Sequence, residues 1–208
     1  MKRKLPQTQQ VSKSIPRYVE IKHEHYSLTY DTELHYPTLV NWVEVDQDLV
    51  EGSTSVDRGN NFQADPILNE SVQQVWESGD YDRGHNCPAK DNQFSEQAET
   101  ESFYYTNMTP QHPNLNRITW KKLEEITRLL AKNDKRVEVW CGSYGDIGKI
   151  GNTVTIPEYC WKIIKYDNRI TLAFIMPNKE EVNEKHYIQY LTTVEEIRRQ
   201  SGLSLQDI

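Results

Sequence analysis

Three early stretches of the chain alternate apolar with polar residues, and this alternation constrains the fold more than any other feature. They cover residues 18–22, 26–31 and 39–45. A period of two is typical of strands that place one face on a core and the other on solvent, as in antiparallel sheets. Further strands are predicted where β-branched and aromatic residues are enriched, at 136–140, 159–166 and 170–176.

Helical periodicity marks two other stretches. From Asn116 to about Lys132 the apolar residues recur at a spacing that gives one buried face, and residues 193–199 predict a second amphipathic helix that ends at Gly202. Weaker patterns predict a short helix at 92–101 and a strand at 103–106. Together the elements predict an α+β fold, with a central antiparallel sheet flanked by helices.

Composition and length favour one compact domain. The 208 residues contain no repeat, low-complexity tract or Gly/Ser/Pro linker, so we expect a polar N-terminal arm over 1–17 and a single domain over 18–208. Only 36% of the residues are hydrophobic, but 5 Trp, 12 Tyr and 4 Phe exclude a disordered chain. The longest apolar stretch, residues 172–176, is far shorter than the roughly 20 residues of a membrane span, so no membrane partner is predicted.

Charge is distributed unevenly along the sequence. The formal net charge of -7 argues against a polyanionic partner. However, residues 31–101 hold 16 acidic side chains and only three basic ones, Arg58, Arg83 and Lys90, whereas residues 115–140 hold 7 basic and 4 acidic side chains. We therefore expect any anion site to combine the 115–140 segment with those three basic residues.

A histidine follows an arginine closely in the sequence Asp-Arg-Gly-His at 82–85, directly before Asn-Cys-Pro at 86–88. We expect His85 to lie on a turn and to face solvent or a substrate. An imidazole accepts a proton from water at physiological pH, and the adjacent Arg83 suits a phosphate oxygen. The alternative is a histidine whose ring is satisfied by hydrogen bonds within the turn. His112, beside Pro113, is the second candidate to line a cleft.

Asn116 stands near the start of the long predicted helix, and Glu124 follows eight residues later. An asparagine oxygen suits Mg²⁺, which keeps several waters and takes few protein ligands. Eight residues of α-helix separate two positions by about 12 Å and roughly 80°, so we expect Glu124 to hold a metal-bound water or to orient a neighbour. The alternatives are an ordinary helix N-cap for Asn116 and a solvated surface position for Glu124.

The cysteines give little guidance. Cys87, Cys141 and Cys160 form no CxxC pair, so the sequence neither demands nor excludes one disulfide, such as Cys141 with Cys160. A zinc site at His85 and Cys87 lacks further ligands at a suitable spacing. We therefore favour buried, apolar roles for the thiols.

Four motifs occur in order along the chain. They are Arg58-Gly-Asn-Asn-Phe-Gln-Ala-Asp-Pro, Asp82-Arg-Gly-His, Phe103-Tyr-Tyr-Thr-Asn-Met-Thr-Pro-Gln and Leu115-Asn-x-x-x-Trp-x-x-Leu-Glu. With later matches such as Trp161-Lys162, the pattern resembles the DNA/RNA non-specific endonuclease family over about residues 18–205. These are the ββα-metal (His-Me finger) nucleases, which include the Serratia nuclease and endonuclease G.

The resemblance implies a reaction and a role for each matching residue. The reaction is hydrolysis of phosphodiester bonds in DNA and RNA, which leaves 5′-phosphate ends and uses one Mg²⁺, with Mn²⁺ as a substitute. The implied roles are His85 as general base, Asn116 as metal ligand with waters, Arg58 as phosphate and transition-state ligand, Asn107 near the catalytic centre, Glu124 as outer-sphere acid and Arg83 as structural or phosphate-binding arginine.

Two other functions stay open at this point. One is a catalytically weak nucleic-acid-binding module on the same fold, and the other is a toxin-like nuclease that acts on one nucleic acid and is controlled by an inhibitor. Candidate partners besides the substrates are a second copy of this chain and a proteinaceous inhibitor. The basic residues 1–4 are not followed by the apolar region of a signal peptide, although the resemblance implies a secreted or periplasmic enzyme.

Overall fold

A seven-stranded antiparallel sheet is the centre of the fold in this computed structural model, which describes residues 15–46, 55–70, 72–132, 135–184, 186–205 and 208. Most of the predicted arm over 1–17 therefore lies outside the described residues. The spatial order of the strands is β1-β2-β3-β6-β9-β10-β11. Their bounds are β1 (Tyr18–Lys22), β2 (Tyr26–Asp31), β3 (Tyr36–Glu44), β6 (Val137–Tyr144), β9 (Tyr159–Tyr166), β10 (Ile170–Pro177) and β11 (Leu191–Thr192).

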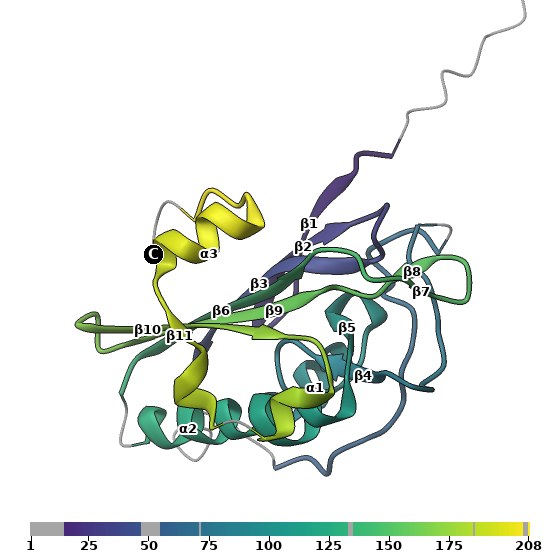
Figure 1. Cartoon of the computed structure of the whole chain (residues 1–208). Helices are drawn as coiled ribbons and strands as arrows, with labels where there is room; N and C mark the ends of the chain where they lie inside the picture. The colour runs from purple at the N-terminus through teal and green to yellow at the C-terminus, as the bar shows by residue number, and fades with distance from the viewer. Residues whose placement is uncertain (1–14, 47–54, 71, 133–134, 185, 206–207) are drawn as a thin grey trace, which may run out of the picture.

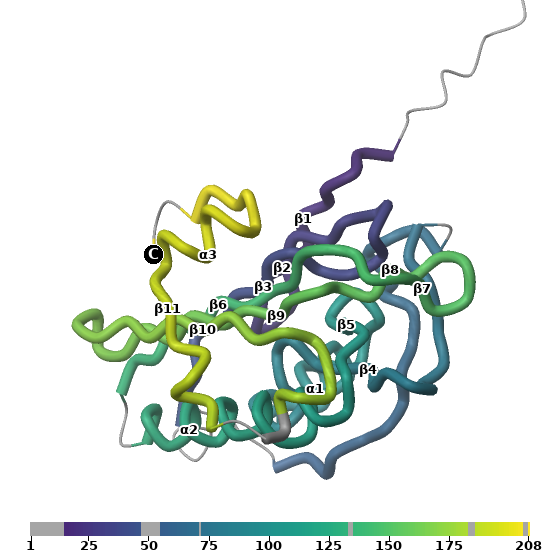
Figure 2. The backbone as a smooth tube through the Cα atoms, in the orientation of Figure 1, coloured from purple at the N-terminus to yellow at the C-terminus, as the bar shows by residue number. Residues whose placement is uncertain are grey.

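Helices cover both faces of this sheet (Figure 1). On one face lie α1 (Glu96–Ser102) and α2 (Lys121–Ala131), together with the paired strands β4 (Asp82–His85) and β5 (Met108–Gln111). The tube in Figure 2 shows α3 (Val194–Ser201) on the opposite face. Smaller elements are β7 (Lys149–Ile150), β8 (Val154–Thr155), a π-helical turn (Leu115–Trp120) and 3₁₀ turns at Ala89–Asn92, Tyr105–Asn107, Glu180–Glu184 and Tyr187–Tyr190. The predicted α+β class with an antiparallel sheet is confirmed.

Strand β9 shows why the middle of the sheet reads as almost continuously apolar. Trp161 and Ile163 belong to the core on the α3 side, whereas Cys160 and Ile164 belong to the core on the α2 side. Because both faces of the sheet are covered, side chains that point to either face are buried. The strand therefore does not alternate between apolar and polar residues. Lys162 is the exception, since it is a lysine on the α2 side with no exposed surface.

The predicted helix near the C-terminus is confirmed, and local chemistry explains its ends. The Thr193 hydroxyl accepts a hydrogen bond from the backbone N–H of Glu196, which satisfies one of the free donors of the first turn. Gly202 ends the helix with a φ of 72°, a left-handed conformation that favours glycine.

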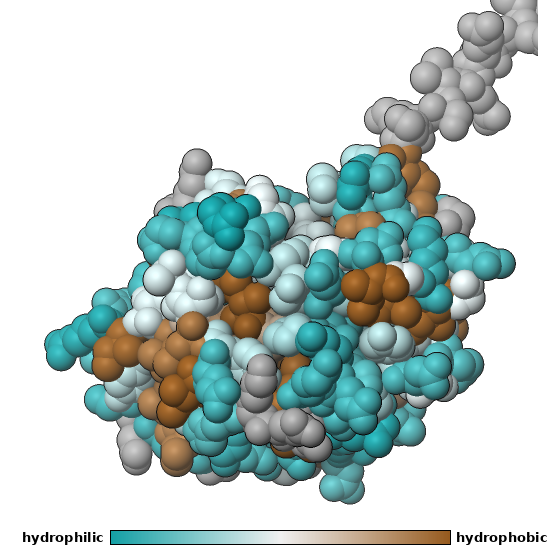
Figure 3. Space-filling view, viewed as in Figure 1, coloured by the Kyte–Doolittle hydropathy of each residue, from teal (hydrophilic) through white to brown (hydrophobic). Residues whose placement is uncertain are grey.

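The face seen in Figure 3 is mostly hydrophilic, with separate hydrophobic patches. Among the described residues, no helix combines the length and the apolar character needed to cross a bilayer.

Two local predictions were wrong, one because local backbone hydrogen bonds complete α1 and the other because a strand pairs with a distant one. Residues 103–106, predicted as a strand, instead finish α1 and enter a 3₁₀ turn, and the strand begins only at Met108. His85, expected on a turn, is the last residue of β4. Its strand pairs with β5, whose register places Gly84 opposite Thr109. Gly84 also has no room for a Cβ, which would stand 2.2 Å from the Gln111 side chain.

Candidate active site

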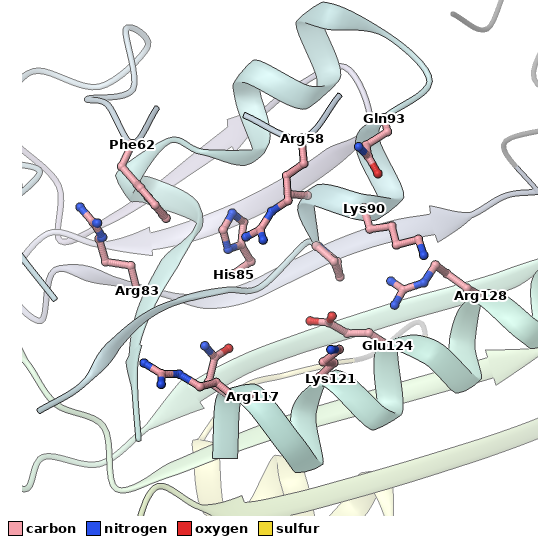
Figure 4. Close-up of a pocket in the computed structure, with 13 residues that line it drawn as sticks. Arg58, Phe62, Arg83, His85, Lys90, Gln93, Arg117, Lys121, Glu124 and Arg128 are labelled. Carbon is pink, nitrogen blue, oxygen red and sulfur yellow. The ribbon is translucent and has the colours of Figure 1, made fainter. Parts of the chain in front are cut away.

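A cavity of about 390 Å³ opens where β4 ends, between the loop that carries Arg58 and the first turns of α2 (Figure 4). Five of the six residues assigned by resemblance line it, and Asn107 does not. The lining residues are Arg58, Phe62, Arg83, His85, Pro88, Ala89, Lys90, Gln93, Asn116, Arg117, Lys121, Glu124 and Arg128. Segments that are far apart in the sequence therefore meet at one site.

The cavity is strongly basic although the chain as a whole is acidic. Six of its lining residues carry a basic side chain, and Glu124 is the one acidic residue among them. Arg58, Arg83 and Lys90 are the three basic residues of the acidic region 31–101, and the other three come from the 115–140 segment. The folded chain thus brings together the two sources of positive charge that the sequence analysis singled out. Such a cluster attracts an anion with several charges, for instance a phosphodiester backbone.

His85 lies on the wall of this cavity and has a neutral imidazole at physiological pH. Burial lowers the pKa of His85 to about 3, and the charges of Arg58 and Arg83 act in the same direction. Its ring makes an edge contact with Phe103, with the ring centroids 4.9 Å apart. Nε2 is buried and has no hydrogen-bond partner among the described residues. Nε2 of this neutral imidazole therefore has no competing hydrogen bond among the described residues and is available to accept a proton, and its low pKa makes it a weaker base than an ordinary histidine.

The two arginines beside His85 differ in how firmly they are held. The Arg83 guanidinium lies 3.9 Å from the centre of the Phe62 ring and donates a hydrogen bond of 3.2 Å to the Tyr105 hydroxyl. Arg58 is exposed, and its guanidinium lies 5.8 Å from the Phe103 ring centre. Arg83 is therefore packed into the wall, whereas Arg58 extends from a loop over the cavity (Figure 4).

Asp82 determines how the Asn116 amide is oriented. The Asn116 Nδ2 donates a hydrogen bond of 3.0 Å to Asp82, and Arg117 donates two more to the same carboxylate, of 2.8 and 2.6 Å. Burial acts to raise the pKa of Asp82, but these hydrogen bonds outweigh it and the pKa lies below its usual value. An ionised carboxylate accepts only, so the amide nitrogen must face Asp82. The Asn116 oxygen is thereby left available to a ligand in the cavity.

Glu124 shares the cavity with Asn116, although an ideal α-helix separates the two positions by roughly 80°. The physical reason is the π-helical turn Leu115–Trp120. A π turn contains more residues than an α turn, so each residue advances by a smaller angle and Glu124 is brought back toward the Asn116 side. Two apolar residues that the helical pattern placed on the buried face are exposed, Ile118 at 47% and Leu129 at 71%. Glu124 is therefore not the solvated surface residue that we weighed as an alternative.

The Glu124 carboxyl extends from α2 into the cavity (Figure 4) and is partly buried there. Burial raises the pKa of Glu124 to about 7, against the opposing charge of Lys162. Its protonation state consequently changes near neutral pH. A carboxyl group of this kind either accepts or donates a hydrogen bond, depending on pH.

Asn107 is fully buried outside the cavity, and its amide holds the chain that follows His85. Its Oδ1 accepts from the Cys87 N–H at 3.0 Å, and its Nδ2 donates to the carbonyls of Cys87 and Ser102 at 2.9 Å each. These contacts favour a positioning role over contact with a substrate. His112, the second candidate base, is not among the lining residues. The three cysteines are buried and unpaired.

The donor chemistry at Asn116 fits a hard cation. The described residues contain no group of three or more His, Cys, Asp or Glu side chains that is arranged to hold a metal. The cavity instead offers the free Asn116 oxygen and, farther along the helix, the Glu124 carboxyl. One amide oxygen and few other protein ligands suit an ion such as Mg²⁺, which keeps most of its waters. Soft, multi-ligand sites of the zinc type are not favoured here.

The sequence reasoning missed several residues of this site. Arg117 and Lys121 line the cavity, and Asp82 orients Asn116. A signal for Asp82 was present, since it begins the Asp-Arg-Gly-His motif. Arg117 and Lys121 are four positions apart, so the helical pattern also predicts that they lie on the same face of the helix.

The family model described as DNA/RNA non-specific endonuclease matches residues 7–207. The chain belongs to this family. A DNA/RNA non-specific endonuclease is a hydrolytic enzyme, and the family is metal-dependent. The ββα-metal fold predicted from the resemblance is also confirmed, by similarity to a solved structure of EndoG.

Relatives in other organisms are nucleases. A nuclease of Nostoc sp. is 28% identical over 202 residues, covering 89% of this chain and 72% of that protein. The mitochondrial nuclease of Saccharomyces cerevisiae is 30% identical, covering 73% of this chain and 55% of that protein, so the chain spans about half of this longer relative. A crystal structure of the EndoG/EndoGI complex, described as showing the mechanism of EndoG inhibition, matches with a TM-score of 0.76, 26% identity and coverage of 88% and 84% of the two chains.

Because Asp82 orients the Asn116 amide, we expect Asp82→Asn to lower activity and metal affinity in this endonuclease. An asparagine at 82 accepts fewer hydrogen bonds and leaves the Asn116 amide free to rotate. Changes to such outer contacts typically cost about 10 to 100-fold. Cleavage rate and Mn²⁺ affinity measure the effect. The matched control is Asp80→Asn, which removes the same charge at an exposed position, and a wild-type metal affinity in Asp82→Asn would contradict the assignment.

Proposed function

We propose that this chain hydrolyses phosphodiester bonds of both DNA and RNA, with His85 as general base, and leaves 5′-phosphate ends. The observation that carries the proposal is a neutral imidazole on the wall of a cavity that holds six basic side chains. A neutral base and a positively charged surface for the substrate are the two requirements of water attack on a phosphodiester.

The proposed reaction divides the work among residues of the cavity. A substrate phosphate binds at Arg58, whose exposed guanidinium reaches two phosphate oxygens at once. His85 accepts a proton as the water oxygen bonds to phosphorus, and the bond between phosphorus and the 3′ oxygen breaks. The 3′ oxygen takes up a proton from solvent water and leaves as a hydroxyl, so the phosphate stays on the 5′ side. Arg58 offsets the negative charge that grows on the phosphate oxygens in the transition state. Arg83, packed on Phe62, helps to keep His85 neutral between turnovers.

The proposed metal site is the oxygen of Asn116, with Mg²⁺ as the ion and Mn²⁺ as a substitute. Support comes from Asp82, which occupies the amide nitrogen and so leaves the oxygen for a cation. When bound, Mg²⁺ supplies positive charge to the phosphate and to the leaving oxygen. The hydrogen bond from the Trp120 indole to the His85 carbonyl, 3.3 Å long, links the helix that carries Asn116 to the strand that carries the base.

Removal of divalent metal is expected to abolish cleavage. Supercoiled plasmid and a structured RNA are each incubated with the protein in Mg²⁺, in Mn²⁺, in Zn²⁺ and in excess EDTA. We expect cleavage with the first two ions and little with Zn²⁺, because an amide oxygen and waters lack the nitrogen and sulfur ligands that zinc favours. Undiminished cleavage in EDTA contradicts the proposal.

The metal site itself is tested by Asn116→Ala. This variant should bind Mn²⁺ more weakly than the wild type, as measured by electron paramagnetic resonance without substrate.

The same experiment separates this proposal from the two alternatives. A restricted nuclease cleaves only the plasmid or only the RNA. A binding module without activity binds both nucleic acids and cleaves neither. Action on both substrates is supported by the character of the cavity, which presents charges suited to phosphates. Proteins that contact phosphates and not base edges do not distinguish sequences. End-labelled products that a ligase joins directly carry the 5′-phosphate and 3′-hydroxyl that we propose.

A proteinaceous inhibitor is a further proposed partner. It is supported by the structural similarity to EndoG, whose crystal structure was solved in complex with EndoGI. A basic cavity of this kind is blocked most simply by an acidic surface that replaces the phosphates. A homodimer and a secreted or periplasmic location stay predictions.

A further inference from the structure

Arg58 has the proposed transition-state role, yet its side chain is exposed on a loop. The guanidinium lies 5.8 Å from the centre of the Phe103 ring. A group that stabilises a transition state must already be in place when the charge develops, and a displacement of about 1 Å can cost about 10²-fold in rate. The position of the guanidinium therefore depends on how firmly the backbone of the loop is held.

The loop is attached to the body of the protein on both sides of Arg58. Before it, the Val56 N–H donates to the Gln93 carbonyl at 3.0 Å, and the Gln93 side chain donates to the Val56 carbonyl at 2.8 Å. After it, the Gln63 carbonyl accepts a hydrogen bond of 3.0 Å from the Tyr105 N–H. Neither attachment involves the two peptide groups that flank Arg58.

Glu99 makes the attachment that lies next to Arg58. The Gly59 N–H donates a hydrogen bond of 2.6 Å to Oε1 of Glu99. This N–H shares a rigid peptide plane with the Arg58 carbonyl, so the carboxylate orients the backbone on the C-terminal side of the arginine. The loop passes close to the carboxylate, since a Cβ at position 59 would stand 3.0 Å from the same oxygen. A glycine at 59 permits this approach.

Glu99 is a charged residue type at a buried position of α1, with an exposed fraction of 8%. A carboxylate loses favourable hydration when it is buried, and hydrogen bonds from donors offset that loss. Hydrogen bonds to a charged acceptor are shorter and stronger than those between neutral groups, which fits the 2.6 Å distance to Gly59. A position that served packing alone would carry an apolar residue, as the neighbouring Ala98 does.

We propose that Glu99 is a positioning residue for the nuclease reaction. Its carboxylate, through the Gly59 N–H, holds the Arg58 backbone so that the guanidinium is directed over the cavity before a substrate binds. The inference rests on the proposed function and deepens it. Glu99 is not among the residues that line the cavity, so it acts through Arg58 and not on the substrate.

The first test removes the acceptor. Glu99→Ala should lower kcat by about 10-fold with little change in KM, because a displaced Arg58 affects the transition state more than ground-state binding. Glu99→Gln keeps an oxygen that accepts the Gly59 N–H and should restore most of the rate. Glu96→Ala is the matched control and should keep the wild-type kcat, since it removes the same charge from an exposed position in the first turn of α1.

A double-mutant cycle distinguishes this role from a general contribution to stability. If Glu99 acts through Arg58, Glu99→Ala should change the rate by less than about 2-fold when Arg58 is already replaced by alanine. In a His85→Ala background Arg58 is still present, so the loss of about 10-fold should remain. A role in stability alone gives the same loss in both backgrounds.

Amide hydrogen exchange provides a readout that needs no activity. Loss of a hydrogen bond to a charged group raises the population of the open state by about 10-fold or more. The Gly59 amide, followed by heteronuclear NMR, should therefore exchange at least about 10-fold faster in Glu99→Ala than in the wild type. The Tyr105 amide, which donates to Gln63 at the other attachment, should keep its wild-type exchange rate.

The outcomes separate this inference from the proposed function. A wild-type protein that cleaves neither plasmid nor RNA contradicts the proposed function, while exchange of the Gly59 amide still tests the attachment by Glu99. Unchanged exchange of Gly59 in Glu99→Ala, or an equal loss of kcat in the Arg58→Ala background, overturns the inference even if the wild type is an active nuclease. Circular dichroism checks folding. If the alanine variant does not fold, Glu99→Met, which keeps the length of the side chain without a strong acceptor, replaces it in the same measurements.

Discussion

Replacement of His85 by alanine is expected to lower the cleavage rate at least about 10²-fold, because general-base catalysis contributes about 10² to 10⁴-fold in enzymes. The variant should still bind nucleic acid, since Arg58, Arg83 and the basic residues of α2 are unchanged. The measurement is kcat on plasmid DNA beside the dissociation constant for a short duplex in Ca²⁺. His112→Ala, an equal change outside the cavity, is the control and should retain activity.

The pH dependence of the wild type provides a second check on His85. A general base with the ordinary histidine pKa of about 6.5 makes activity rise with pH through that value, but burial and the neighbouring arginines move the pKa of His85 to about 3. His85 is therefore already neutral between pH 5 and 8 and produces no limb in that range. An acid limb near pH 7 is expected from Glu124, whose pKa is raised to about 7 by burial. Loss of that limb in Glu124→Gln distinguishes the two groups.

The low pKa of His85 also predicts an effect on stability. The unfolded chain binds a proton at His85 near the ordinary pKa of about 6.5, whereas the folded chain does not until about pH 3. As the pH falls through this window, the unfolded state is stabilised by the proton that it binds, so the free energy of unfolding decreases. His85→Ala removes this contribution. We expect the melting temperature of the variant to fall less than that of the wild type between pH 7 and 5.

The catalytic role has its own contradicting outcome. If His85→Ala cleaves nucleic acid at nearly the wild-type rate, His85 is not the general base.

Replacement of Arg58 by alanine is expected to lower kcat by about 10² to 10³-fold, the typical cost of losing one group that stabilises charge in a transition state. Arg58 is exposed, so the substitution should not disturb packing or the melting temperature. KM should rise much less than kcat falls, because five other basic side chains still bind the substrate in its ground state.

Arg58→Lys tests whether shape or charge matters at this position. Lysine keeps the charge but loses the planar group that binds two phosphate oxygens, so an intermediate kcat is expected. Lys122→Ala is a matched control, because it removes a basic side chain of α2 that does not line the cavity. If Arg58→Ala changes only KM, Arg58 binds the substrate but does not stabilise the transition state.

Much of the sheet could be predicted because strand periodicity is a local property. The stretches at 18–22 and 159–166 coincide with β1 and β9, and the end of α3 follows from Gly202. The prediction failed at residues 103–106, where aromatic residues favour a strand but backbone hydrogen bonds complete α1 instead. β-propensity mainly measures how a side chain fits its surroundings, so it is least reliable where those surroundings come from distant parts of the chain.

For the candidate site, the sequence by itself determined which chemical groups are present and their order along the chain. Only the tertiary structure decided their arrangement. The pairing of β4 with β5 brings His85 to a strand end, and a π turn brings Glu124 to the same side as Asn116. Lys162 shows the limit most clearly, since its burial beneath Trp120 depends on a helix about 40 residues away. Residue type and period are encoded locally, whereas burial, pKa and the meeting of distant side chains depend on contacts that form only when the whole chain folds.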